Sequence, residues 1–355
     1  MKAMKIDLLR PKVPSFEDLT PYLKRIDKTG KYSNFGPLNE ELISRLADYF
    51  DVEYSQVHTV SNATQGINGA IQILSKDAGS VWDLPAWTFA ATPSALKQAR
   101  GYGVFCDIDN EWRVIPSSES SFLIDVLPFG DNLRSKPLPK NIHSIVIDGA
   151  ASFDALKQVG KNLETNTFLI VSMHATKLMP GGEGGIVIIK NHELSKKFRS
   201  WTNYGFESSR HSINFGTNAK ISEYTAAVAL ASLDQWDLIR NKFLENSKFA
   251  LEVSRSLSLN VNTSMTNGYA TPYWILKCES PDQKESFVSS LRSNSIAYRD
   301  WWEAGCHKMS AFSSFKFGTL DNTDKVSSLT LGLPFHYFMR ESDFLKILSV
   351  LEKVY

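Results

Sequence analysis

The 355-residue sequence is poor in cysteine, carries almost no net charge and contains no long apolar run. Its cysteines, Cys106, Cys278 and Cys306, show no paired spacing, so they predict neither a disulfide framework nor a zinc site and fit a reducing compartment. The 39 basic side chains against 38 acidic ones give a formal net charge of +1, which excludes a global attraction to nucleic acid or to an anionic membrane. No apolar run approaches the ~18 residues of a membrane span.

The N-terminal segment also has no continuous apolar stretch of the signal-peptide kind, and the chain shows no internal repeat or low-complexity tract. The hydrophobic fraction of 43% is enough for a sizeable core, whereas disordered chains are poorer in apolar residues. These features predict a cytoplasmic globular protein, of enzyme size, with no nucleic-acid, membrane or metal partner.

Short apolar segments alternate with helix-like stretches through the first half of the chain. Strands that are apolar on both faces and regularly interleaved with helices predict an α/β protein with a mostly parallel sheet. The apolar spacing at 38–50 predicts an amphipathic helix, and residues 61–76 are interpreted as a turn that leads into a second helix. The expected strands lie at 79–85, 101–109, 120–130, 143–150, 167–174 and 184–190.

A long helical segment at 222–257 leaves the expected sheet and begins a second unit. Beyond it, strands are expected at 271–279 and 327–334, and helices at 282–294 and 341–355, which describes a smaller α+β domain. The chain length also suggests two or three domains. We therefore expect a large domain over 1–235 and a small C-terminal domain over 236–355.

Lys177, in SMHATK, follows a buried-looking strand and precedes the glycine-rich GGEGG segment. The carboxyl edge of a sheet is where α/β proteins bind ligands, and a partly desolvated lysine forms Schiff bases. Taken alone, such a lysine is more often simply solvated, and the glycines are also compatible with a hairpin turn. They are not the GxGxxG fingerprint, which argues against a nicotinamide-dependent sugar oxidoreductase.

Asp148, in HSIVIDGAAS, ends another apolar strand 29 residues before Lys177, a distance of about one strand–helix–strand unit. Neighbouring strands could therefore present both groups at one edge. A pyridoxal phosphate (PLP) site needs this pair, because the lysine holds the cofactor aldehyde and the carboxylate keeps the ring nitrogen protonated. The alternative for Asp148 alone is a helix N-cap.

The remaining parts of such a site also have candidates. Ala63 and Thr64 open a helix and could offer N–H groups and a hydroxyl to a phosphate at the positive end of the helix dipole, and Ser172 could add a second hydroxyl. A planar ring needs a flat partner, which Trp87 or Phe89 could provide. Each of these residues also has an ordinary structural explanation, as a cap, a strand-end serine or a core aromatic.

The order of SNATQG, PAWTFAAT, VFCDID, VIDGAAS, SMHATK, GGEGG and FGTNAKISEYTAAVALASL resembles the DegT/DnrJ/EryC1/StrS family. These are PLP-dependent nucleotide-sugar aminotransferases with the aspartate-aminotransferase fold, PLP fold type I. The resemblance runs from about residue 5 to the C-terminus. It implies a large PLP-binding domain, with a mixed, mostly parallel sheet flanked by helices, and a smaller α+β domain.

The resemblance assigns roles to single residues. Lys177 matches the Schiff-base lysine, and because dehydrating relatives have histidine there, it favours transamination. Asp148 matches the carboxylate at the pyridine nitrogen, and Phe89 the stacking residue, with Trp87 as second choice. The phosphate contacts match Ala63, Thr64 and Ser172.

Four further positions complete this comparison. Asn218 matches an asparagine that reaches the phosphate of the partner subunit in relatives, which implies a homodimer with a shared active site. Glu183 and Glu223 fit the pattern, and we interpret both as structural. Ala151 departs from it, because the family commonly has a glutamine there that can touch the cofactor ring hydroxyl.

The implied reaction moves an amino group from L-glutamate, through the pyridoxamine form PMP, to a dTDP- or UDP-linked 4-keto-6-deoxyhexose. The alternatives are amination at C3 of a 3-keto-6-deoxy sugar nucleotide and a non-catalytic PLP-binding regulatory protein. The product would be a 4-amino-4,6-dideoxy sugar nucleotide, for cell-surface polysaccharide such as O-antigen or for natural products. Candidate substrate residues are Asn34, Tyr204, Arg299, Trp301, His307 and His336; a structural histidine is as compatible with His307, and a surface salt bridge with Arg299.

Overall fold

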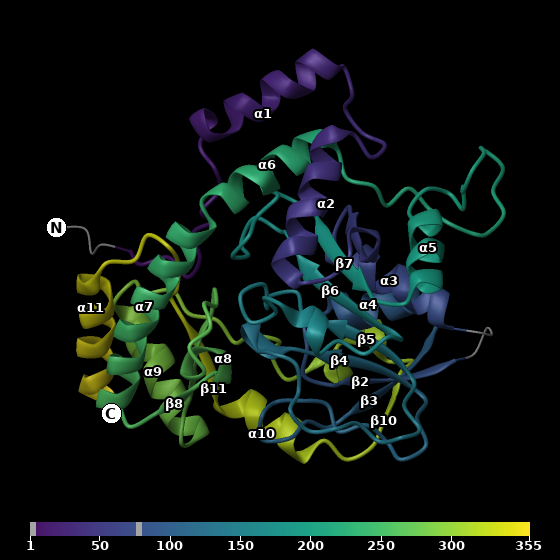
Figure 1. Cartoon of the computed structure of the whole chain (residues 1–355). Helices are drawn as coiled ribbons and strands as arrows, with labels where there is room; N and C mark the ends of the chain where they lie inside the picture. The colour runs from purple at the N-terminus through teal and green to yellow at the C-terminus, as the bar shows by residue number, and fades with distance from the viewer. Residues whose placement is uncertain (1–4, 76–79) are drawn as a thin grey trace.

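An eight-stranded sheet runs through the larger part of the molecule (Figure 1). The structure, a computed structural model, describes residues 5–75 and 80–355. The strand order is β1-β7-β6-β5-β4-β2-β3-β10. The six neighbouring strands β6-β5-β4-β2-β3-β10 are parallel, whereas β7 is antiparallel to both of its neighbours, β1 and β6. The strands are β1 (Val57–Val60), β2 (Val81–Pro85), β3 (Tyr102–Cys106), β4 (Phe122–Val126), β5 (Ser144–Asp148), β6 (Thr167–Ser172), β7 (Gly185–Ile189) and β10 (Lys316–Phe317).

Both faces of this sheet are covered, which explains why its strands are apolar on both sides. In β6, Leu169 and Val171 face one core cluster, and Phe168 and Ile170 face a second one. The first cluster includes α2 (Pro37–Phe50) and α6 (Glu223–Asp234). The second cluster includes α3 (Ala63–Leu74), α4 (Ala91–Gln98) and α5 (His192–Trp201). The predicted α/β class with a mostly parallel sheet is confirmed.

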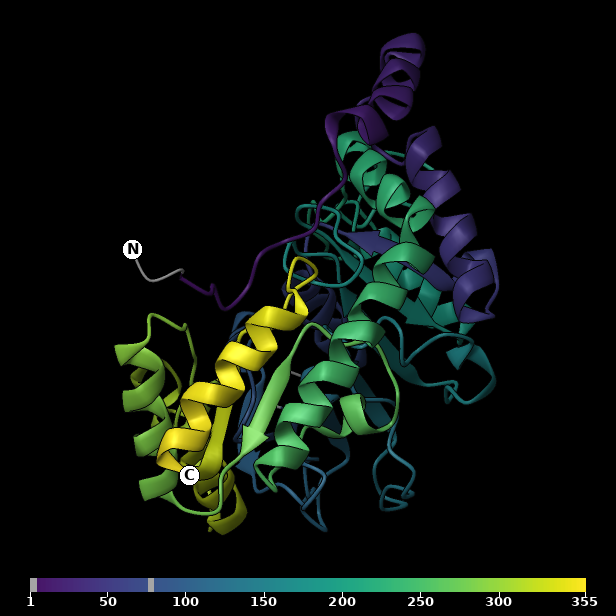
Figure 2. The ribbon, with the colours of Figure 1, turned by 90° about the vertical axis from the view of Figure 1, so that its left-hand side faces the viewer.

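A second, smaller layer is built around the three-stranded antiparallel sheet β11-β9-β8. The long helix α7 lies beside α11 on one side of it (Figure 2). The strands are β8 (Asn260–Val261), β9 (Trp274–Lys277) and β11 (Thr330–Leu333); the helices are α7 (Trp236–Ser256), α8 (Thr263–Thr266), α9 (Pro281–Ser293), α10 (Asp321–Leu329) and α11 (Glu341–Leu351), and α1 (Phe16–Thr29) packs on α6.

Some segments differ from the sequence-based expectation. The single helix expected at 222–257 is two helices, α6 and α7, which meet at Gln235 (φ −98°, ψ 7°). The strand expected from residue 327 begins only at Thr330, because the preceding residues end helix α10.

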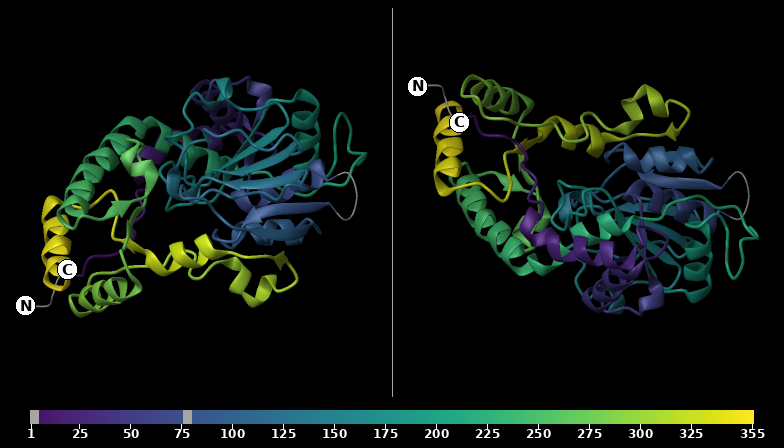
Figure 3. Two further views of the ribbon diagram at one scale, coloured as in Figure 1. Left: turned by 90° about the horizontal axis from the view of Figure 1, so that it is seen from below. Right: turned by 90° about the horizontal axis from the view of Figure 1, so that it is seen from above.

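Two segments also cross the boundary expected at residue 235. Near the N-terminus, Ile6 pairs with Ile296, which belongs to the smaller part. In the other direction, the two-residue strand β10 joins the edge of the large sheet beside β3, and Figure 3 shows its segment running along the large sheet. Asp107, just after β3, accepts hydrogen bonds from the N–H groups of Asn322 (3.0 Å) and Thr323 (2.8 Å) at the start of α10. The two parts are therefore interlocked rather than consecutive.

No helix within 5–75 or 80–355 has both the length and the apolar character that crossing a membrane requires.

Glu223 caps the start of α2 from another helix. Its buried carboxylate accepts hydrogen bonds from the backbone N–H groups of Leu38 (2.8 Å) and Asn39 (2.9 Å), while the N-cap residue Gly36 has no side chain to do so. A Cβ on Gly36 would come within 2.5 Å of the Glu223 side chain, so the glycine makes room for this contact.

We expect Glu223→Ala to lower the free energy of unfolding by about 1–3 kcal/mol, because it leaves two buried N–H groups without a partner. Urea denaturation of the purified protein measures this loss. Glu193→Ala is a matched control, since Glu193 lies in the first turn of α5, which is already capped by Asn191. Equal stability of the two variants would contradict the capping role.

Candidate active site

Lys177 and Asp148 line one cavity of about 360 Å³ at the carboxyl edge of the large sheet. Asp148 is the last residue of β5, and β6 beside it is parallel, with Asp148 opposite Ile170. Lys177 follows five residues after β6 ends at Ser172. Because parallel strands end at the same edge, the two functional groups are brought together as their spacing predicted.

The loop between β6 and β7 fixes the backbone around Lys177. The Lys177 N–H donates to the carbonyl of His174 (2.9 Å), the Ala175 N–H to Gly182 (2.9 Å), and the Gly181 N–H to Met173 (2.7 Å). The hairpin reading of the glycine-rich segment is therefore correct as well, since Gly182 adopts a φ of +83° that favours glycine.

The Lys177 amine makes a hydrogen bond with the hydroxyl of Tyr273, with Nζ and Oη 2.8 Å apart. Tyr273 directly precedes β9 and lines the same cavity, so the smaller part of the molecule contributes to the site. Sequence reasoning did not single out this tyrosine, because it appeared only as one aromatic in an expected strand.

Asp148 is a buried carboxylate, with 7% of its surface exposed. It accepts hydrogen bonds from the Thr92 hydroxyl (2.7 Å) and from the Ala150 N–H (3.2 Å). Burial raises the pKa of this carboxyl, while the two hydrogen bonds and the positive charge of Lys177 act against that rise. No helix follows Asp148 directly, so the helix N-cap alternative is excluded.

A ready anion site lies at one side of the cavity. Ala63 and Thr64 form the first turn of α3, and Ser172 lies beside them; all three line the cavity. Asn62 caps the helix by accepting from the Gln65 N–H (2.9 Å). Close approach of this turn to β7 depends on Gly185, where a Cβ would come within 2.8 Å of the Ala63 nitrogen. The first-turn N–H groups and the helix dipole favour a phosphate here.

The two candidate stacking residues differ in position. Phe89 lines the cavity and is 61% exposed, so its ring is available to a ligand. Trp87 is only 1% exposed and packs against Trp112, Phe129 and Trp302, with ring centroids 4.8–5.6 Å away. The structure therefore rules out the second choice, Trp87, because its faces are already covered.

The predicted substrate residues do not all lie together. Arg299 and Trp301 line the cavity, joined by Trp302 and Tyr273, which were not predicted. Asn34 (φ +59°), Tyr204 and Asn218 lie outside the lining, and all three are exposed.

The two histidines also lie outside that lining. His307 is buried in a short helical turn, with its ring 5.3 Å from that of Phe317 and Nε2 3.9 Å from Asp324. Burial lowers the pKa of its imidazole, so its surroundings fit the structural alternative rather than a ligand role. His336 borders a much smaller neighbouring cavity that also reaches Lys177.

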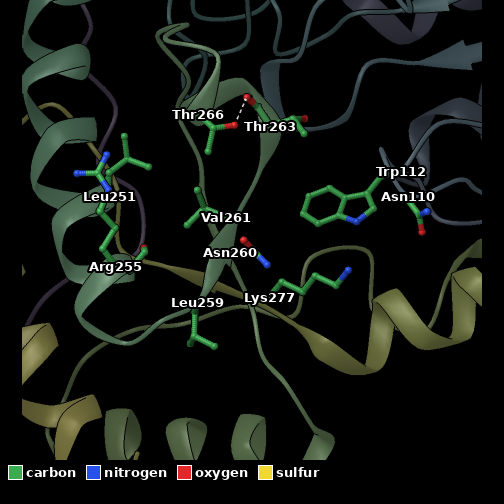
Figure 4. Close-up of a pocket in the computed structure, with 11 residues that line it drawn as sticks. Asn110, Trp112, Leu251, Arg255, Leu259, Asn260, Val261, Thr263, Thr266 and Lys277 are labelled. Carbon is green, nitrogen blue, oxygen red and sulfur yellow. Dashed lines mark hydrogen bonds between the residues drawn. The ribbon is translucent and has the colours of Figure 1, made fainter. Parts of the chain in front are cut away.

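A larger cavity of about 480 Å³ lies between the small sheet and the loop that carries Trp112 (Figure 4). Lys277 and Asn260 also line it, and none of the predicted site residues does. Within the described residues, no group of three or more His, Cys, Asp or Glu side chains could hold a metal ion. Except for Asn218, the residues predicted to bind the cofactor line the Lys177–Asp148 cavity instead.

The residues of that cavity fit PLP. They provide an amine for its aldehyde, a buried carboxylate for its ring nitrogen, a helix N-terminus for its phosphate and an exposed aromatic face for its ring.

The model of the DegT/DnrJ/EryC1/StrS aminotransferase family matches residues 16–120 and 143–352. The chain belongs to this family. It is a PLP-dependent aminotransferase of fold type I, and the predicted enzyme class, cofactor and fold are confirmed.

Individual relatives are distant. Protein Rv3402c of Mycobacterium tuberculosis is 26% identical over 98% of this chain and 90% of its own length. A dTDP-4-amino-4,6-dideoxy-D-glucose transaminase of Shigella dysenteriae is 23% identical over 93% of this chain and 94% of its own.

Two solved structures share the fold. DesI, crystallised with its TDP-sugar product, has a TM-score of 0.85 at 23% identity, covering 99% of this chain and 93% of DesI. NtdA from Bacillus subtilis, with bound PMP, has a TM-score of 0.82 at 21% identity, covering 95% of this chain and 81% of NtdA.

Proposed function

We propose that this aminotransferase moves the amino group of L-glutamate to a dTDP- or UDP-linked 4-keto-6-deoxyhexose. The product is a 4-amino-4,6-dideoxy sugar nucleotide. The observation that carries the proposal is the single cavity that Lys177 shares with Asp148. The sugar and its C4 position are supported by the family, by the name of the Shigella relative and by the YSNFGPL opening.

In this proposal the cavity residues that match the cofactor have defined tasks. When bound, PLP supplies a ring that accepts electron density from the substrate carbon. Asp148 holds a proton on the ring nitrogen. Lys177 takes a proton from the substrate carbon and returns one later, so the full reaction has no net uptake or release of protons by this amine. The first turn of α3, with Thr64 and Ser172, binds the phosphate.

The cavity wall suits a nucleotide sugar. Arg299 has its guanidinium 5.0 Å from the ring centre of Trp301, and both side chains line the cavity. A guanidinium binds a diphosphate or the glutamate carboxylate in a bidentate manner, and flat indole faces bind sugars and bases. We therefore assign substrate binding to Arg299 and Trp301 first, ahead of the predicted residues outside the cavity.

We also propose a homodimer in which Asn218 of each subunit reaches the partner's site. The segment between α5 and α6 projects from the body of the molecule (Figure 1) and exposes Phe215 to 80%. Ile213 and Tyr204 on the same segment are also exposed. A second copy of the chain would cover this apolar surface. The reaction would take place in the cytoplasm and feed polysaccharide or natural-product assembly.

The test uses the visible absorbance of the purified PLP-loaded protein, at about 410–430 nm for a lysine-bound cofactor. L-Glutamate should bleach this band, and a 4-keto-6-deoxy sugar nucleotide should restore it. Mass spectrometry should then find the mass of the amino sugar nucleotide in the reaction mixture. dTDP- and UDP-linked 4-keto and 3-keto sugars are compared in parallel. Restoration by a 3-keto sugar alone would replace C4 by C3 amination, and a band unaffected by any amino donor would favour a regulatory PLP-binding protein.

A further inference from the structure

The hydroxyl of Tyr273 is placed to act on the amine of Lys177. Its Oη lies 2.8 Å from Lys177 Nζ, and the ammonium group is 5.3 Å from the centre of the Tyr273 ring. The two residues come from different parts of the molecule: Lys177 from the loop after β6, and Tyr273 from the residue before β9. The contact therefore also joins the two parts across the cavity.

The Tyr273 ring is held in place on several sides. It lies edge-on to Trp301 and Phe129, with centroid distances of 5.1 and 5.5 Å. The backbone N–H of Tyr273 donates to the Thr271 hydroxyl (3.3 Å), and this hydroxyl donates in turn to the carbonyl of Phe129 (2.6 Å). A ring clamped in this way has few alternative rotamers, so its hydroxyl is a fixed reference point for the amine.

A phenol suits an amine that changes its protonation state. In the reaction, Lys177 alternates between a neutral amine and an ammonium as it takes a proton from the substrate carbon and returns one. The phenol oxygen accepts a hydrogen bond from the ammonium, and its O–H donates to the lone pair of the neutral amine. Rotation of the hydroxyl about its C–O bond therefore keeps the hydrogen bond between Tyr273 and Lys177 in both protonation states of the amine.

We propose that Tyr273 is a positioning residue that holds the freed Lys177 amine in line for proton transfer. This role rests on the aminotransferase activity and is independent of which sugar is the acceptor. Hydrogen bonds to a charged group are the stronger ones, so the contact should favour the ammonium over the neutral amine.

The first test measures Lys177 in the cofactor-free protein, by trace acetylation at a series of pH values and mass spectrometry of its peptide. In Tyr273→Phe, the midpoint of Lys177 reactivity should move to lower pH by about half a unit or more, because the ammonium loses an acceptor. The other titratable groups around the amine are Asp148, His174, Glu183 and Arg299 in its cavity and Arg10, Lys12 and His336 beside it. All of them are unchanged in the variant.

Tyr269→Phe is the matched control, since its hydroxyl accepts from Asn132 (2.9 Å) and lies outside the cavity lining. It should leave the Lys177 midpoint at the wild-type value. Tyr273→His serves as the rescue variant, because a neutral imidazole also donates and accepts. It should lie between wild type and Tyr273→Phe.

The second test follows the half-reaction with L-glutamate in the PLP-loaded protein. Tyr273→Phe should lower its maximal rate by about 10- to 100-fold while KM changes by less than about 2-fold. A rate and a Lys177 midpoint equal to those of the control would overturn the proposal. Neither readout involves a sugar, so failure of the proposed acceptor would leave this result unaffected, and the reverse also holds.

Discussion

Lys177→Ala should lose amino transfer by about 10³–10⁶-fold, because the group that forms the covalent bond and moves the proton is removed. The visible band of the PLP-loaded protein should disappear with it. Borohydride reduction followed by mass spectrometry should find cofactor mass on the peptide that contains residue 177 in the wild type and on no peptide of the variant. The fold should be retained, since the amine's partner is a cavity hydroxyl rather than a core group.

Lys190→Ala is the control for this experiment. Its amine also makes a hydrogen bond, to the carbonyl of Gly160 (2.8 Å), but lies outside the cavity lining. The control should keep its colour and its activity. A Lys177→Ala protein with more than about one per cent of wild-type turnover would contradict the assignment of the amine.

Several parts of the site that sequence reasoning found lie at the end of an apolar strand or at the start of a helix. Asp148 closes β5, Ser172 closes β6 and Thr64 opens α3. Apolar runs and capping patterns are local, so they can be read without the fold. The order of parallel strands then brings these ends to one edge.

The parts that it missed depend on contacts between distant segments. Tyr273 is 96 residues from Lys177, and Thr92 is 56 residues from Asp148. Nothing within a few residues of either marks it as a partner. The choice between Trp87 and Phe89 has the same origin, because packing against Trp112 and other rings decides which aromatic is buried.

The fold shows the same division. The apolar strands of the large sheet were predictable, whereas β10 has only two residues and belongs to the sheet solely through its pairing with β3. The break between α6 and α7 falls at Gln235, with neither proline nor glycine there to indicate it. Long segments with clear periodicity were therefore found, and short or tertiary-determined ones were not.

Asp148→Asn should reduce activity and, in the cofactor-free protein, increase stability. The amide has no charge with which to hold a proton on the ring nitrogen, so turnover should fall by about two to four orders of magnitude. The polar contacts can persist: the amide oxygen accepts from the Ala150 N–H, and its NH₂ can donate to Thr92, whose hydroxyl can turn to Thr88 at 3.1 Å.

The gain in stability follows from the sign of the pKa shift. Burial raises the pKa of Asp148 in the folded protein above its unfolded value. The folded state then binds the proton more tightly, so stability falls as pH rises through that window. The wild type therefore loses stability as pH rises above 4, whereas the variant, which has no charge to bury, does not. Its advantage in unfolding free energy should shrink as pH falls toward 4.

Denaturation of the two cofactor-free proteins at pH 4 and pH 7 measures this difference, and Asp154→Asn provides the contrast. Asp154 is equally buried, but it pairs with Arg240 (2.6 Å) and accepts from the Ala270 N–H (2.8 Å), so losing its charge should destabilise the protein. Opposite signs for the same chemical change would show that Asp148 is retained against the stability of the empty protein. Such a cost is expected where a charge is held ready for a cofactor. If Asp148→Asn were as destabilising as Asp154→Asn, the carboxylate would instead be a structural group.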